Sequence, residues 1–309
     1  MRKLLTILLS LTALCASAQK ADSIVLKNAV LYYYSYGSGE PIIILSGGPG
    51  VSAHQEDDLA IELSKKYRAI LFEQRGTGKS RVQPFDSTTI NLAAALTDLD
   101  TLRQHLKQQQ LTISGHSWGA MLAAAYAEKY PANVRSLILI GPGELDLQMS
   151  PIVNASIHVR DQIIDDSAFY YWSDSARAAA EPEKADSALR RISWSNFTYD
   201  RKKLDSVMVQ VNHGTYSRKM GSFMWYSLVK QKFNIVQSLR NKYKGDALVI
   251  FGWQDPVGSI TYPMYEKAFP RAVIKGINKC GHMPTVEQPT EFYQAVFSFL
   301  EKRPLLKNR

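Results

Sequence analysis

Short apolar runs alternate with helix-patterned segments along most of this chain, and that alternation constrains the fold more than any other feature. The run 41–45 (PIIIL) is apolar throughout, as strands covered on both faces are. Strands that alternate with helices form a mostly parallel sheet with helices on its faces. Strands are expected at 23–36 (two short ones), 41–45, 68–72, 111–115, 135–140, 247–252 and 272–277, and helices at 55–67, 89–106, 118–130, 262–269 and 291–301.

The alternation stops after Gly143 and resumes near residue 241. Residues 145 to about 240 have almost no strand pattern and are rich in aromatic side chains within helical segments. A helical insertion in an α/β sheet explains this most simply. We therefore predict a core domain made of 19–143 and 241–309, with a helical cap at 144–240.

The first residues predict a signal peptide. A basic start (Arg2 and Lys3) precedes an apolar stretch, 4–14, and then Ala16-Ser17-Ala18, a typical cleavage site. The apolar stretch is too short to stay in a bilayer as a helix, so no membrane integration is expected after cleavage. The alternative is a buried N-terminal helix. We expect cleavage after Ala18 and export to the periplasm or the medium.

Charge and cysteine usage exclude several classes of protein. The formal net charge is +9, spread along the chain apart from a basic tail at 301–309, without the basic and aromatic stripe that nucleic-acid binding requires. Without the signal peptide, Cys280 is the only cysteine, so no internal disulfide can form. No metal-ligand cluster is visible, and neither a metal nor an organic cofactor is expected.

The segment Gly115-His116-Ser117-Trp118-Gly119 lies between a predicted strand and a predicted helix. It fits the pattern G-x-S-x-G, in which a tight turn presents a serine hydroxyl at the carboxyl edge of a sheet. Side chains two positions either side of the serine would collide, which explains both glycines. Ser117 is the candidate nucleophile.

Two later residues suit the roles of base and orienting acid. Asp255 follows the strand 247–252, and His282 follows the strand 272–277. The order serine, acid, histidine at successive strand ends is that of α/β-type hydrolases. Taken singly, Asp255 could be a turn residue before Pro256, and His282 a solvated loop residue. Together with Ser117 they predict a catalytic triad.

A triad also needs backbone donors for the oxyanion that develops on the substrate. The N–H of Trp118, directly after the nucleophile, is one candidate. The second donor is expected from Gly47 or Gly48, in the loop after the strand 41–45. Glycine there allows the backbone to approach the substrate.

Three motifs resemble those of the α/β-hydrolase superfamily and, more narrowly, of the proline iminopeptidase (prolyl aminopeptidase) family. They are SGGPG (46–50), EQRGTGKS (73–80) and GHSWG (115–119). The resemblance covers residues 40–142 and 245–300 and covers the helical insertion poorly. It implies an α/β-hydrolase fold, with a mostly parallel eight-stranded sheet flanked by helices and a helical cap.

The sequence departs from that family at three motif positions. Ser46 replaces a histidine, Glu73 an aspartate, and His116 a glycine. None of these changes removes a catalytic group. Glu73 and Arg75 are expected to form an ion pair behind the oxyanion loop, because buried glutamate and arginine are usually paired.

The predicted cap, 144–240, differs from the family pattern more than these three motif positions do. Prolyl aminopeptidases hold the substrate's free amino terminus with cap carboxylates, and the segment that would carry them has no clear match here. The candidate substrate-binding residues are Trp172, Trp194, Trp225, Asp161 and Glu181.

These features predict an exported serine hydrolase, an aminopeptidase resembling proline iminopeptidase that acts through an acyl-enzyme on small peptides. The alternative is a carboxylesterase or lactonase for small hydrophobic esters. A third hypothesis is an inactive binding protein on a hydrolase scaffold. A haloalkane or epoxide hydrolase would carry aspartate where this chain has Ser117. The sequence predicts no oligomeric state.

Overall fold

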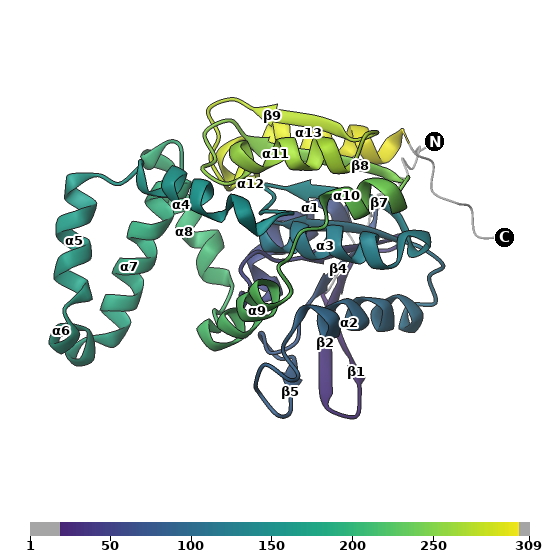
Figure 1. Ribbon diagram of the computed structural model, residues 1–309, viewed down its shortest axis with the longest axis horizontal. Helices are drawn as coiled ribbons and strands as arrows, with labels where there is room; N and C mark the ends of the chain where they lie inside the picture. Colours follow the sequence, from purple (N-terminus) through teal and green to yellow (C-terminus); the bar gives the residue numbers. More distant parts are fainter. Residues whose placement is uncertain (1–18, 303–309) are drawn as a thin grey trace, which may run out of the picture.

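The computed structural model describes residues 19–302, so the predicted signal peptide lies outside the described residues. A single twisted sheet forms its centre (Figure 1), with the continuous strand order β1-β2-β4-β3-β6-β7-β8-β9. The strands are β1 (Lys20–Val25), β2 (Ala29–Tyr36), β3 (Pro41–Leu45), β4 (Arg68–Phe72), β5 (Arg81–Val82), β6 (Leu111–His116), β7 (Val134–Ile140), β8 (Asp246–Gly252) and β9 (Val273–Ile277).

The pairs from β4 to β9 are parallel, whereas β1, β2 and β5 pair antiparallel at one end of the sheet. The predicted mostly parallel sheet is therefore confirmed. Eight strands form the continuous path, and the two-residue β5 is a ninth that pairs only with β2.

The apolar run in β3 explains why both faces of the sheet are covered. Ile42 and Ile44 point into one hydrophobic cluster, and Ile43 and Leu45 point into the other. This is the two-residue period of a strand, with an apolar side chain for each face. The helices α1 (Asp57–Ser64) and α13 (Pro289–Glu301) cover the first face.

The second face is covered by helices that precede and follow the predicted nucleophile. They are α2 (Leu92–His105), α3 (Trp118–Lys129), α10 (Val236–Lys242) and α11 (Gly258–Ala268). Ten of the twelve residues of α3 are buried, from Trp118 to Ala127. A helix buried nearly all round is fixed in position, and so is the turn at its beginning.

The chain between β7 and β8 is helical. Its helices are α4 (Ser150–His158), α5 (Ile163–Ser173), α6 (Ser175–Ala180), α7 (Pro182–Phe197), α8 (Leu204–His213), α9 (Arg218–Lys230) and α10, with short 3₁₀ turns at Leu147–Met149 and Arg201–Lys203. In Figure 1, α5 and α6 lie at the tip of this segment, away from the sheet. In contrast, Met220, Met224 and Leu228 of α9 belong to the core cluster. The insertion thus contains an outer part and a part packed on the core.

Among residues 19–302, no helix combines the length and the apolar character that crossing a membrane requires.

Candidate active site

Ser117 forms the corner between β6 and α3. Its backbone has φ 54° and ψ −114°, a conformation that residues other than glycine rarely adopt, and its N–H donates to the Ile140 oxygen at 2.8 Å. A Cβ on Gly115 would lie 2.3 Å from the Gly119 oxygen, and one on Gly119 would lie 2.4 Å from the Leu45 oxygen. The two glycines of the motif are therefore sterically required by this corner.

Asp255 and His282 follow β8 and β9, and their side chains meet. The Nδ1–H of His282 donates to Oδ2 of Asp255 at 2.9 Å, and the Asp255 side chain is completely buried. Burial alone would raise the pKa of Asp255. The charge and hydrogen bond of His282 and the backbone N–H groups of Val257 and Gly258 outweigh burial and lower this pKa. Asp255 is thus an anion that orients the imidazole of His282.

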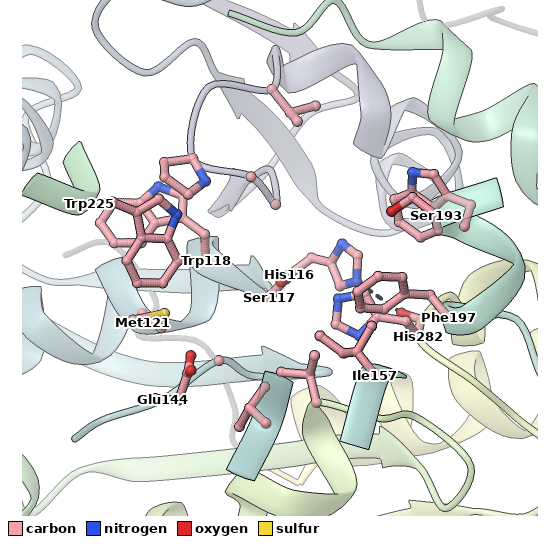
Figure 2. A pocket seen from close by; sticks show the side chains of 18 of the residues that line it. His116, Ser117, Trp118, Met121, Glu144, Ile157, Ser193, Phe197, Trp225 and His282 are labelled. Carbon is pink, nitrogen blue, oxygen red and sulfur yellow. Dashed lines mark hydrogen bonds between the residues drawn. The ribbon is translucent and has the colours of Figure 1, made fainter. Parts of the chain in front are cut away.

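Ser117 and His282 line the same cavity, which has a volume of about 550 Å³ (Figure 2). Gly47, Gly48 and Trp118 line it too. Among the described residues, none accepts a hydrogen bond from the N–H of these three. The first N–H groups of a helix have no partner within it, so the Trp118 N–H at the start of α3 is available to an anion.

Gln74, in the motif at 73–80, connects the loop that carries Gly47 and Gly48 to the corner at Ser117. The Trp118 indole Nε1–H donates to Gln74 Oε1 at 2.8 Å, and Gln74 Nε2 donates to the Ser46 oxygen at 3.2 Å. One buried glutamine side chain therefore holds both segments that carry the candidate oxyanion donors.

The predicted ion pair between Glu73 and Arg75 is wrong. Arg75 instead binds Asp98 of α2 through two N–H groups, at 2.6 and 2.5 Å, and both side chains are buried. Glu73 accepts hydrogen bonds from the Thr77 hydroxyl at 2.9 Å and the Ala53 N–H at 3.2 Å. Burial raises the pKa of Glu73. The guanidinium joins the motif loop to α2 and does not neutralise Glu73.

His116 takes part in a buried network that the sequence did not indicate. Its Nδ1 lies 3.1 Å from Oε1 of Glu56, and its Nε2–H donates to the backbone oxygen of His282 at 2.9 Å. Burial opposes protonation of His116, but the charge and hydrogen bond of Glu56 outweigh it and raise the pKa of His116. The residue before the nucleophile thus contacts the residue that carries the candidate base.

Glu287 holds the other side of the His282 loop. Its carboxylate accepts from the N–H groups of Tyr199 (2.8 Å), Gly281 (3.0 Å) and Met283 (3.3 Å). Burial raises the pKa of Glu287, although these three hydrogen bonds favour the anion. Glu287, which lies five residues after His282, was not among the site residues predicted from the sequence.

The structure separates the predicted cap residues into two groups. Trp194 and Trp225 line the cavity, and the Trp194 ring lies 6.2 Å from the His282 ring. Trp172, Asp161 and Glu181 do not line this cavity.

Each of these three residues has partners elsewhere. Trp172 on α5 packs edge-on against Tyr171. Asp161 accepts from Asn196 and pairs with His158, and Glu181 pairs with Lys184. The only carboxylate that lines the cavity among the described residues is Glu144, which follows β7 and the segment Gly141-Pro142-Gly143.

Within residues 19–302, no three histidine, cysteine, aspartate or glutamate side chains gather in a way that could hold a metal ion.

The strand order, the elbow and the paired acid and histidine define a class of hydrolase. The family model described as the alpha/beta hydrolase fold matches residues 40–289, and the chain belongs to that family. A proline iminopeptidase of Heyndrickxia coagulans is 27% identical over 277 residues, which is 85% of this chain and 91% of that protein. A proline iminopeptidase of Xylella fastidiosa (strain 9a5c) is 38% identical over 118 residues, only 37% of this chain and 36% of that one. The chain therefore resembles prolyl aminopeptidases.

Solved structures agree on the fold. An alpha/beta fold family hydrolase from Bacillus anthracis str. Sterne matches with a TM-score of 0.71 at 18% identity, covering 91% of this chain and 99% of that one. A thermophilic esterase from Thermogutta terrifontis matches with a TM-score of 0.64 at 19% identity, covering 92% and 98%. At such identities the likeness concerns the fold.

Proposed function

We propose that this hydrolase is a serine aminopeptidase that releases the N-terminal residue of small peptides through an acyl-enzyme. One observation carries the proposal: Ser117 at a strained elbow faces the same cavity as His282, whose imidazole is hydrogen-bonded to the buried Asp255. The likeness to a proline iminopeptidase over 85% of the chain supports the choice of substrate.

In the proposed reaction, the Ser117 hydroxyl attacks the carbonyl carbon of the first residue while Nε2 of His282 takes its proton. Asp255 holds the proton on Nδ1, so Nε2 is the nitrogen left free to act as the base. The tetrahedral intermediate then collapses, and His282 gives the proton to the leaving amine. Water, activated by His282, hydrolyses the ester on Ser117 and frees the amino acid.

The oxyanion would be held by the Trp118 N–H and by a glycine N–H from the loop 47–48. Both come from segments fixed by Gln74, so they are in place before the charge develops. Such preorganised donors lower the barrier more than mobile ones do, and one donor contributes about 3 kcal/mol in comparable enzymes.

The cavity walls suggest what acyl group fits. Trp194, Phe197 and Trp225 supply aromatic surface near Ser117, which suits a small apolar group such as a prolyl ring. A second cavity of about 330 Å³ adjoins the first, because both are lined by Val51, Gln55, Ser193, Trp194 and Tyr216. We assign it to the leaving part of a short peptide.

A carboxylesterase or lactonase is the second candidate. The same residues would attack an ester, and the esterase from Thermogutta terrifontis has the same fold. Prolyl aminopeptidases hold the substrate's amino terminus with cap carboxylates, and Asp161 and Glu181 do not line the cavity here. This observation favours the esterase.

Three substrates separate the two candidates, tested on residues 19–309 with Ser117→Ala as the control. They are a proline arylamide with a free amine, its N-acylated twin, and a short-chain nitrophenyl ester. An aminopeptidase cleaves the free-amine arylamide and spares the acylated one. Cleavage of the ester with neither arylamide cleaved would overturn the aminopeptidase and leave the esterase.

We also propose, from residues 1–18 of the sequence, that the chain is exported and cleaved after Ala18. N-terminal sequencing of the exported protein tests this: Gln19 is expected as the first residue, and retention of Met1 would contradict it.

A further inference from the structure

One carboxylate reaches the candidate active site from the connection that follows β7 and not from a helix of the cap. Glu144 lies in the connection between β7 and α4, one residue after Gly143, whose N–H donates to the Ser117 backbone oxygen at 3.3 Å. Figure 2 shows the Glu144 carboxylate directed into the cavity, beside Met121. The residue before Glu144 is thus hydrogen-bonded to the backbone of Ser117, which fixes the Glu144 backbone close to the nucleophile.

Glu144 is buried but has no partner. Only 7% of the residue is exposed, and no described residue forms a hydrogen bond or an ion pair with its side chain, although burial and, to a smaller extent, the charge of Glu144 raise the pKa of Tyr265. The other buried carboxylates near the site are all bound: Asp255 by His282, Glu56 by His116, and Glu287 by three backbone N–H groups. The Glu144 oxygens have no such partner and are open to the cavity, where a cationic group of a bound molecule can pair with them.

The cavity itself offers no positive partner. No lysine or arginine lines it among the described residues, and its two histidines already bind Glu56 and Asp255. A cationic partner for Glu144 would therefore come from the substrate.

The position of Glu144 indicates which cationic group of the substrate it binds: the α-ammonium or a side-chain cation. When Ser117 attacks, the substrate's carbonyl carbon lies at its oxygen, and the α-amine is only one carbon further away. Glu144 directly follows Gly143, whose N–H contacts the Ser117 backbone, and its side chain lines the same cavity as Ser117. An α-amine held next to Ser117 therefore lies in the cavity that Glu144 faces.

We propose that Glu144 binds the α-ammonium of the substrate and so determines specificity for a free amino terminus. This rests on the proposed function and deepens it. It also departs from what the resemblance implies, because the carboxylate belongs to the loop after β7, while Asp161 and Glu181 of the cap lie outside the cavity. A short charge-assisted hydrogen bond would replace the water that the amine loses on binding.

The test compares wild type, Glu144→Gln and Glu266→Gln. Glutamine keeps the size of the side chain and removes its charge, and Glu266 is an exposed glutamate of α11. Each protein is assayed with proline methyl ester and N-acetylproline methyl ester, and separately with the two matching arylamides. Labelling of Ser117 by a fluorophosphonate verifies that each variant retains its folded site.

Glu144→Gln should lower kcat/KM for the free-amine ester about 30-fold or more, and leave the N-acetyl ester within about 3-fold. Glu266→Gln should match wild type with both. An unchanged preference in Glu144→Gln overturns the inference, and so does a wild type that does not prefer the free amine.

The two proposals can fail separately. If wild type cleaves esters but neither arylamide, and Glu144→Gln removes the preference for a free amine, the peptidase fails and the role of Glu144 stands. If wild type requires a free amine on arylamides and Glu144→Gln keeps that requirement, the role of Glu144 fails and the peptidase stands.

Discussion

The Nε2–H of His116 donates to the backbone oxygen of His282 at 2.9 Å, so the residue before the nucleophile holds the loop of the candidate base. The other ring nitrogen of His116 lies 3.1 Å from the Glu56 carboxylate. Neutral imidazole has one N–H, whereas imidazolium has two. Since both neighbours are acceptors, only the protonated ring satisfies both, in agreement with the raised pKa of His116.

Glu56→Gln should therefore destabilise the protein in a pH-dependent way. A raised pKa in the folded state means that His116 contributes its stability fully below the unfolded value of about 6.5 and loses it as pH rises through the folded value. Wild type should exceed Glu56→Gln in free energy of unfolding by about 1–3 kcal/mol at pH 6, and by less at pH 9. Urea unfolding at the two pH values measures this.

The exposed pair of His158 and Asp161 serves as the control for that experiment. Asp161→Asn should change the free energy of unfolding by less than about 1 kcal/mol at either pH. A Glu56→Gln effect that is equal at pH 6 and pH 9 would contradict a charged His116.

Asp255→Asn tests the orientation of the base. The amide nitrogen of asparagine donates where the carboxylate accepted, so His282 would place its proton on Nε2 and lose its basic nitrogen toward Ser117. We expect kcat to fall about 10⁴-fold. Steady-state kinetics on any cleaved substrate measures it, and a fall of less than about 10-fold would remove Asp255 from the triad.

Glu287→Ala should loosen the His282 loop. It removes the acceptor of three buried N–H groups, from Tyr199, Gly281 and Met283. The free energy of unfolding should fall by about 2 kcal/mol or more, and kcat should fall with it. Glu291→Ala, which removes a surface pair with Lys275, is the control and should change stability by less than about 1 kcal/mol. Equal effects of the two changes would show that Glu287 does not hold the loop.

Trp194→Ala and Trp172→Ala separate the cavity from the outer cap. Trp194 lines the cavity near His282, so its truncation should raise KM about 10-fold through lost apolar contact. Trp172 lies on α5, outside the cavity lining, and its truncation should leave KM unchanged. The reverse order of effects would mean that the outer helices close on the substrate.

Much of the core was predictable because its signals are local. The apolar run PIIIL forms β3 with the predicted bounds, Pro41–Leu45, since a strand buried on both faces tolerates little else. The corner at Ser117 was predictable too, because a turn that excludes a Cβ at Gly115 and Gly119 leaves a fixed spacing in the sequence.

Partners across the fold were not predictable in the same way. Arg75 and Glu73 are two residues apart, yet the guanidinium binds Asp98, which lies on α2. Helical periodicity placed that helix but not the residue that faces the loop. In the insertion, charged and aromatic residues occur throughout, and only the packing decides that Trp194 lines the cavity while Trp172 does not. Glu144 lies in the loop after a strand, and nothing in the local sequence distinguishes it from a solvent-exposed loop carboxylate.

The proposed chemistry requires Ser117 to be an activated nucleophile, and labelling with a fluorophosphonate tests this directly. Intact-protein mass spectrometry and peptide mapping would follow native wild type, heat-unfolded wild type, and native Ser117→Ala and His282→Ala. We predict one adduct, on Ser117, in native wild type alone, and labelling at least about 100-fold slower without His282. A natively folded wild type that stays unlabelled, or that is labelled elsewhere, would contradict the proposed hydrolase chemistry.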